Sequence, residues 1–91
     1  MGTFHQHKSE LHGITVVVET TGPLTYVGRY DSQDQHGVHM LDVGIHQTGV
    51  ADVSKDEYIK RSIKFGIRSD HKHLVVPSDQ VLRVTRLGDV V

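Results

Sequence analysis

Apolar and polar residues alternate over most of the chain, and this two-residue period is typical of strands with one buried face. In residues 13–20, for example, Ile14, Val16 and Val18 occupy one face, and Val17 lies on the other. Turns built on glycine, proline, serine or aspartate separate the alternating segments. The segments predicted as strands are 13–20, 24–32, 38–45, 58–68, 73–76 and 81–87.

The strongest alternation lies in residues 58–68. Ile59 and Ile63 fall on one face with further apolar residues, only Arg61 is out of phase, and lysine, serine and glycine take the other face. This pattern predicts a half-buried antiparallel strand. A polar, variable loop is predicted just before it, over residues 46–57.

Short strands joined by tight turns predict an all-β fold, and two glycines indicate where the strands bend. Gly28 and Gly44 sit inside predicted strands, where glycine usually marks a bulge or a sharp bend. We therefore predict a mainly β fold, a small and strongly bent antiparallel five-stranded barrel over residues 13–87. Residues 1–12 are predicted to form a short N-terminal helix or a frayed arm, and residues 1–91 a single domain.

The composition limits what this fold can be. Ninety-one residues bury only part of their surface, and the absence of cysteine excludes disulfides and thiolate metal sites. Exposed edge strands must be blocked or paired, so association of identical subunits into a homo-oligomeric ring would add the missing burial. The chain shows neither a signal-peptide pattern nor an apolar run of about 20 residues, so we expect a cytoplasmic protein with no membrane partner.

Charge is unevenly distributed, although the net charge is only −1. Residues 1–50 carry two basic against five acidic residues, a balance of −3, whereas residues 51–91 carry eight against six, a balance of +2. A ring of subunits would repeat any basic patch around one face, and a solvated mixed surface is the alternative. Eight histidines make the surface charge sensitive to pH near about 6.5.

A motif in the first half of the chain combines apolar strands with glycines and an aspartate. The apolar strand Val16–Val18, the turn glycine Gly22, the strand glycine Gly28, Asp34 and the second apolar strand at Leu41 follow one another at characteristic spacings. This motif resembles that of the Sm-like family, and the resemblance covers roughly residues 10–87. It implies a helix followed by a bent five-stranded barrel that assembles into RNA-binding rings. Short β-barrels of the SH3-like type share most of the same pattern and are the alternative fold.

The chain departs from the family's first motif at two positions. Gly37 stands where a methionine or another bulky residue is usual, and Val38 stands at the asparagine that normally holds a base. The loss of that asparagine argues against uridine-type recognition. His36 and His39 flank the gap and offer a chemical substitute, because imidazole both stacks on bases and forms hydrogen bonds.

The family's second motif fits the chain in two registers. In the first, residues 67–69 resemble its Ile-Arg-Gly step, residues 69–72 form the turn before the last strand, and residues 81–87 are an extra strand. In the second, the motif is residues 74–84, and the turn Pro77–Gln80 joins the last two strands without the arginine. Both registers remain open at this level.

The resemblance implies binding of single-stranded RNA, or of single-stranded DNA, with weak sequence readout. Lysine and arginine would contact phosphates, and imidazole would stack on bases. The alternative is that these are ordinary turn residues and that the ring is a structural or adaptor module. The expected nucleic-acid-binding residues are Asp34 to orient its loop, His36 and His39 for bases, Arg68 and Lys72 for phosphates, and Ser78 in the second turn.

Histidine pairs raise the question of metal binding. His71 and His73 lie two residues apart and would share one face of a strand, and His36 and His39 lie three apart. Either pair would need a further ligand, such as a nearby aspartate, to build a zinc site. We predict no metal site and no cofactor. We also predict no enzymatic activity, because the sequence has no cysteine nucleophile, glycine-rich phosphate loop or nucleophile elbow.

Overall fold

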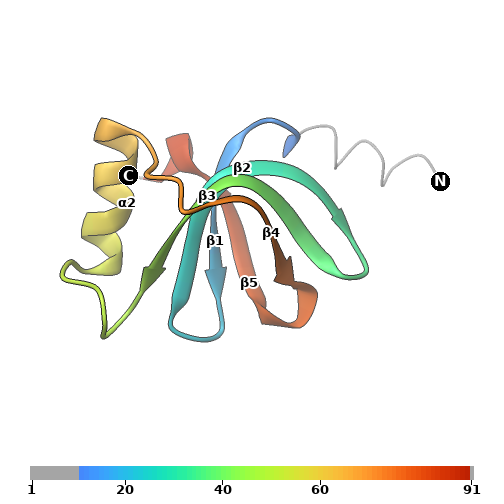
Figure 1. Ribbon diagram of the computed structural model, residues 1–91, viewed down its shortest axis with the longest axis horizontal. Helices are drawn as coiled ribbons and strands as arrows, with labels where there is room; N and C mark the ends of the chain where they lie inside the picture. The colour runs from blue at the N-terminus through green and yellow to red at the C-terminus, as the bar shows by residue number, and fades with distance from the viewer. Residues whose placement is uncertain (1–10, 91) are drawn as a thin grey trace.

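The computed structural model describes residues 11–90. Within that part of the chain, five antiparallel strands form one sheet of spatial order β4-β3-β2-β1-β5, with the helix α2 beside it (Figure 1). The prediction of a mainly β fold with five antiparallel strands is therefore confirmed. The elements are β1 (Thr15–Thr20), β2 (Leu24–Asp34), β3 (Gly37–Gln47), α2 (Lys55–Phe65), β4 (His71–Pro77) and β5 (Val81–Arg86), with 3₁₀ turns η1 (Ser78–Gln80) and η2 (Leu87–Asp89).

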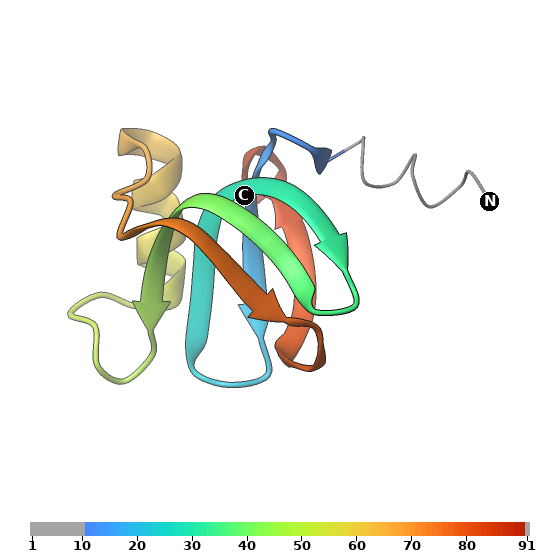
Figure 2. The same ribbon diagram turned by 45° about the vertical axis from the view of Figure 1, so that its right-hand side comes forward.

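The sheet is strongly bent (Figure 2). One of its faces carries the main hydrophobic core. As the alternation predicted, Val16 and Val18 of β1 belong to it, and both are fully buried. Burying one such side chain stabilises the fold by about 1.5–3 kcal/mol. The buried members of this core are Val16, Val18, Tyr26, Tyr30, Val38, Met40, Val43 and Val76.

The strand predicted for residues 58–68 is wrong, because most of this segment forms α2. The Ser54 hydroxyl accepts the N–H of Glu57 at 3.1 Å, a cap that stabilises a helix by about 1 kcal/mol. At the other end, Gly66 donates its N–H to Ser62 O at 3.0 Å. Its φ of 89° is a backbone conformation that glycine adopts at little cost. The caps at Ser54 and Gly66 therefore set the two ends of a helix in a segment whose apolar residues alternate as in a strand.

Burial along this segment also follows the helical period. Ile59 is 6% exposed, whereas Ile63 and Phe65 are 48% and 75% exposed, although a strand would have placed all three on one face. Ile59 packs against Val17 of β1 and Val27 of β2 in a second apolar cluster. Because Val17 alternates with the core valines of β1, this cluster lies on the opposite face of the sheet, and α2 covers it.

The two mid-strand glycines lie where the backbone is bent or closely approached. At Gly28 the pairing of β2 with β3 is irregular, as expected for a bulge. At Gly44 a Cβ atom would lie 2.5 Å from Tyr58 Oη and 2.7 Å from Arg68 O. The absence of a side chain at Gly44 therefore lets α2 and the segment after it rest on the backbone of β3.

His46 of β3 makes a second set of contacts with α2 and with the loop before it. Its side chain is buried, its Nε2 lies 2.8 Å from Val53 O, and its ring centroid lies 5.2 Å from that of Tyr58. Within residues 11–90, His46 Nδ1 is a buried side-chain atom with no hydrogen-bond partner. The imidazole thus ties β3 to the loop before α2 and to α2 itself.

The predicted closure into a barrel is absent from residues 11–90. β4 and β5 form the two edges of the sheet and do not pair with each other. Pro77, the last residue of β4, has no N–H to donate, and η1 then redirects the chain so that β5 pairs with β1. The tight turn predicted at residues 77–80 is confirmed. The helix or frayed arm predicted for residues 1–12 falls mostly on residues 1–10, which lie outside the described part of the chain.

Glu19 of β1 connects this interior strand to α2 and to the edge strand β5. Its carboxylate accepts hydrogen bonds from Arg83 Nε at 2.7 Å and from Lys55 Nζ at 2.9 Å. The Glu19 side chain is 14% exposed, while those of Lys55 and Arg83 are 40% and 64% exposed. The hydrogen bonds from Arg83 and then Lys55 lower the pKa of Glu19 from 4.5 to about 2, against the opposing effect of burial.

Glu19→Gln is expected to remove a pH-dependent part of the stability. Because the folded-state pKa lies below 4.5, the carboxylate stabilises the fold fully above that pH, and this contribution disappears as the pH falls through about 2. Solvent screens the exposed cations, so we expect a loss of about 1–2 kcal/mol at pH 7. Urea unfolding of parent and variant at several pH values measures this. A difference that stays constant from about pH 7 to pH 2 would contradict it.

Candidate nucleic-acid interface

The tip of the long β2–β3 hairpin is shaped by Asp34. Its Oδ1 accepts the backbone N–H groups of His36 at 2.9 Å and Gly37 at 3.3 Å. These are the bonds of an aspartate that closes a turn on its own side chain. The N–H of His36 lowers the pKa of the Asp34 carboxyl, with His39 and Gly37 adding to the effect against a smaller opposing contribution from desolvation. The expectation that Asp34 orients this loop agrees with this geometry.

Two imidazoles lie beside the turn. His39 Nε2 is 3.0 Å from the second carboxylate oxygen of Asp34. The ring of His39 also faces His73 of β4, with the ring centroids 5.7 Å apart and the planes inclined by 30°. The antiparallel pairing of β3 with β4, which sets Leu41 opposite His73, brings the two rings together. Sequence reasoning did not include His73 in the nucleic-acid site, because its position depends on that register.

Ser78 brings the second turn onto the same tip. Its backbone N–H donates to His36 O at 3.2 Å, and its hydroxyl donates to Gln35 O at 3.4 Å. Ser78 belongs to η1, between β4 and β5, and is 43 residues from Gln35 in the sequence. The structure therefore gathers four of the six expected residues, Asp34, His36, His39 and Ser78, on one exposed surface, which we call the hairpin tip.

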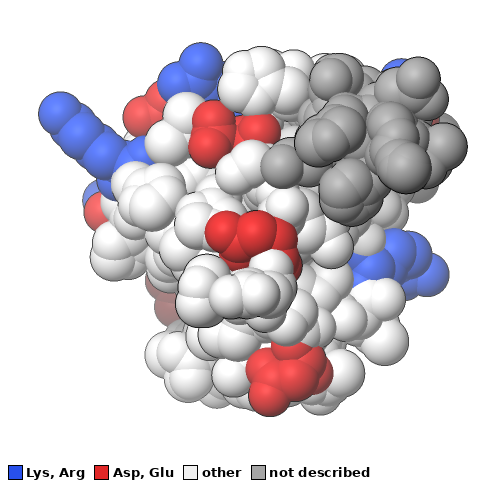
Figure 3. Space-filling model, turned by 90° about the vertical axis from the view of Figure 1, so that its right-hand side faces the viewer, with Lys and Arg blue, Asp and Glu red and all other residues white. Residues whose placement is uncertain are grey.

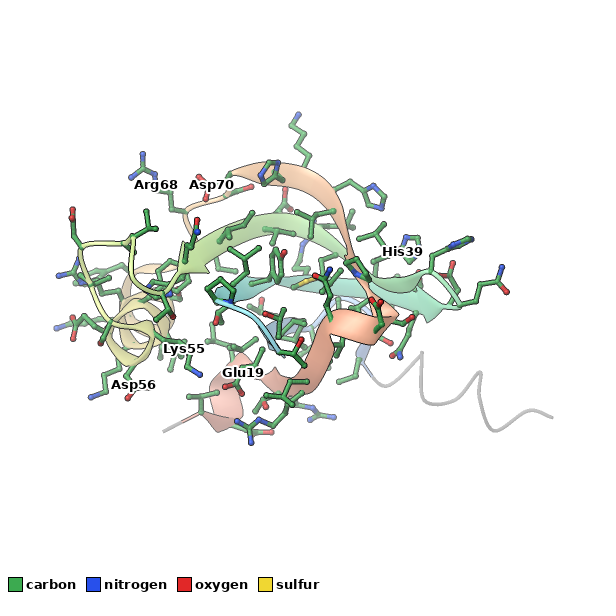
Figure 4. All side chains as sticks on the ribbon, turned by 90° about the horizontal axis from the view of Figure 1, so that it is seen from below. Glu19, His39, Lys55, Asp56, Arg68 and Asp70 are labelled. Atoms are coloured by element: carbon green, nitrogen blue, oxygen red, sulfur yellow. The ribbon has the colours of Figure 1, made fainter. Side chains whose placement is uncertain are left out.

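Arg68 and Lys72 do not join the hairpin tip. Arg68 lies in the connection after α2, and Figure 4 shows it at the α2 end of the molecule, opposite His39. Asp70 holds this connection to the sheet through a bond from its N–H to Val43 O at 2.8 Å. Lys72 is exposed on β4. Because it is next to His73 in the strand, its side chain points to the opposite face from that of His73.

Among residues 11–90, the end of the molecule that carries the hairpin tip is not basic. Figure 3 looks onto that end and shows carboxylates near the middle of the view and lysine and arginine towards its margins. Asp31 and Asp34 lie in the last part of β2, and Asp79 lies in η1. Within residues 11–90, no group of three or more histidine or acidic side chains is placed to hold a metal ion.

The described part of the chain has no helix long and apolar enough to cross a bilayer. No protein-family model matches the sequence, and the search of curated proteins found no match to it.

Proposed function

We propose that this chain is an Sm-like subunit that assembles into a homo-oligomeric ring. Two features support the proposal. Within residues 11–90, β4 and β5 are opposite edges of the sheet, each with one strand partner. β5 also carries Leu82, which is 62% exposed. Pairing of β4 in one subunit with β5 in the next would cover both edges, and such head-to-tail contacts close into a ring when the rotation between subunits allows.

We propose further that the ring binds single-stranded nucleic acid, RNA in particular, with weak sequence readout. The observation that carries this is the convergence of Asp34, His36, His39 and Ser78 on the hairpin tip. His36 and His39 would stack on bases or hydrogen-bond to their edges, while Asp34 holds the turn. A ring repeats the tip once per subunit, so contacts that are weak alone gain from a high effective concentration.

A structural or adaptor ring without nucleic-acid binding is the second candidate. The acidic residues at the hairpin tip favour it, because the phosphates of a nucleic acid are attracted by lysine and arginine rather than by carboxylates. This candidate predicts the same oligomer with no affinity for RNA or DNA.

Light scattering of the full chain, alone and with poly(U) or poly(A), separates these proposals. An oligomer whose mass rises on adding RNA supports the nucleic-acid-binding ring. An oligomer that is indifferent to both polymers supports the adaptor. A monomer of 10.2 kDa that binds neither polymer contradicts both candidates.

His39→Ala is expected to weaken RNA binding by about tenfold, the effect of losing one stacked base. His71→Ala is the matched control, because it removes an exposed imidazole that makes no contact with the hairpin tip. Fluorescence anisotropy with a labelled oligouridylate gives both affinities. Equal losses for the two variants would remove His39 from the site.

A further inference from the structure

The outward face of α2 is a row of cations. Lys60, Arg61 and Lys64 are all exposed, while Ile59 and Ser62 are the buried residues of the helix. Residues three or four apart are neighbours on a helix, so these three side chains lie together on the side away from the sheet. The interpretation of this segment as a strand had instead placed Lys60 and Lys64 apart from Arg61, on opposite faces.

An aromatic ring borders this row. Phe65 is 75% exposed, and Lys64 Nζ lies 5.4 Å from the centroid of its ring. Together with Glu57, Lys60 and Arg61, these two residues line a shallow hollow on the surface. An exposed phenylalanine among cations is the combination that single-strand binding proteins use, because the cations hold phosphates and the ring stacks on a base.

Little of this positive charge is neutralised within the protein. Arg61 Nε forms an ion pair with Glu57 Oε2 at 3.1 Å. Within residues 11–90, neither Lys60 nor Lys64 forms an ion pair. Arg68 follows the helix, is exposed, and lies at the same end of the molecule (Figure 4). In the described part of the chain, cations are therefore gathered at the end of the molecule opposite the hairpin tip.

We propose that Lys60, Lys64 and Phe65, with Arg68, form a surface on α2 that binds the backbone of single-stranded nucleic acid and stacks a base on Phe65. This inference rests on the proposed function, because it supplies the phosphate contacts for the same class of ligand. A long single-stranded nucleic acid would extend from the hairpin tip to α2 of the same subunit, or from one subunit to the next.

Nucleic acid fits this surface better than a lipid bilayer does. A helix that lies in a membrane interface inserts a continuous apolar face. The apolar face of α2 is already occupied, because Ile59 packs against Val17 and Val27 of the sheet. Only Ile63 and Phe65 remain exposed, at the margins of a charged row.

The test is the affinity of the full chain for a labelled 24-nucleotide oligouridylate over a series of salt concentrations. The double variant Lys60→Gln/Lys64→Gln should bind at least about tenfold more weakly at low salt, and two lost phosphate contacts should flatten the logarithmic salt dependence by about 1.4. Phe65→Ala should weaken binding by about fivefold with an unchanged slope. Arg29→Gln is the control, because it removes an exposed cation from β2, outside the α2 surface.

Three results would overturn the proposal. If the double variant matches Arg29→Gln while His39→Ala weakens binding, nucleic acid binds at the hairpin tip and the α2 surface is not used. If the parent binds no oligonucleotide, the proposed function and this inference both fail. If poly-glutamate binds as tightly as RNA and is equally sensitive to the lysine changes, the surface serves acidic protein segments. Thermal melting curves confirm that each variant is folded; Arg29, Lys60, Lys64 and Phe65 are exposed, and His39 is partly buried.

Discussion

Gly37→Ala is expected to lower the free energy of unfolding by about 4 kcal/mol, the largest effect of any single change considered for this protein. Gly37 opens β3 with φ 145°, a conformation that side chains rarely adopt. A Cβ atom there would also collide with the carbonyl oxygen of Val76 in β4, which is backbone and has no rotamer by which to move aside. Both the local conformation and the β3–β4 pairing would have to change.

Chemical denaturation of Gly37→Ala and Gly22→Ala measures this effect. Gly22 is the matched control, because a Cβ atom at that turn would have no neighbour within 4 Å. We expect Gly22→Ala to change stability by less than about 0.5 kcal/mol, as ordinary surface substitutions do. Similar midpoints for the two variants would show that β4 does not approach Gly37 as closely as described.

The second large effect is expected at Ile59. Ile59→Ala should cost about 2–4 kcal/mol, because it removes the side chain that α2 buries against Val17 and Val27. Ile63→Ala, which makes the same chemical change four residues later, should cost less than about 1 kcal/mol, since Ile63 is 48% exposed. The comparison tests the helix directly, because a strand would place both isoleucines on one buried face.

Urea unfolding of the two isoleucine variants gives the comparison. Equal losses of stability would favour the strand predicted from the alternation and contradict α2. Far-ultraviolet circular dichroism of the folded parent provides a separate check, because an 11-residue helix contributes a signal that a strand does not.

Gly37 also gives a physical reason for one departure from the Sm-like motif. The family usually has a bulky residue at this position, but here the backbone of β4 occupies the space that such a side chain would need. The next residue, Val38, is fully buried in the main core, so it is not available to contact a base. His36 and His39, which flank it at the hairpin tip, are at least partly accessible.

The strands that pair with their neighbours in sequence were predictable because their information is local. The alternation in β1, the turn at Gly22-Pro23 and the turn closed by Asp34 each specify a structure within a few residues. The turn at residues 77–80 was predictable for the same reason, since Pro77 fixes its own φ and offers no N–H. Four of the six expected site residues came together because they lie in or beside such turns.

Helix α2 was missed although its local signals are present. Ser54 with Glu57 three residues later, and Gly66 after Phe65, are helix start and stop signals. The alternating isoleucines nevertheless favoured a strand, because a short apolar pattern fits both the period of a strand and the period of a helix. The run of three buried valines in β1 was a further signal, since a strand buried on both faces requires a covering element.

The sequence alone determined the β-rich class, most of the antiparallel strands and the turn closed by Asp34, because each depends on the period of the chain or on a turn of a few residues. That Ser78 joins this turn depends on a contact between residues 43 apart in the chain. Tertiary structure alone decided that α2 covers the second face of the sheet, that Arg68 lies away from the tip, and that His73 lies beside His39. These are contacts between residues distant in the chain. They depend on strand register and on the close approach at Gly44, which no local pattern encodes.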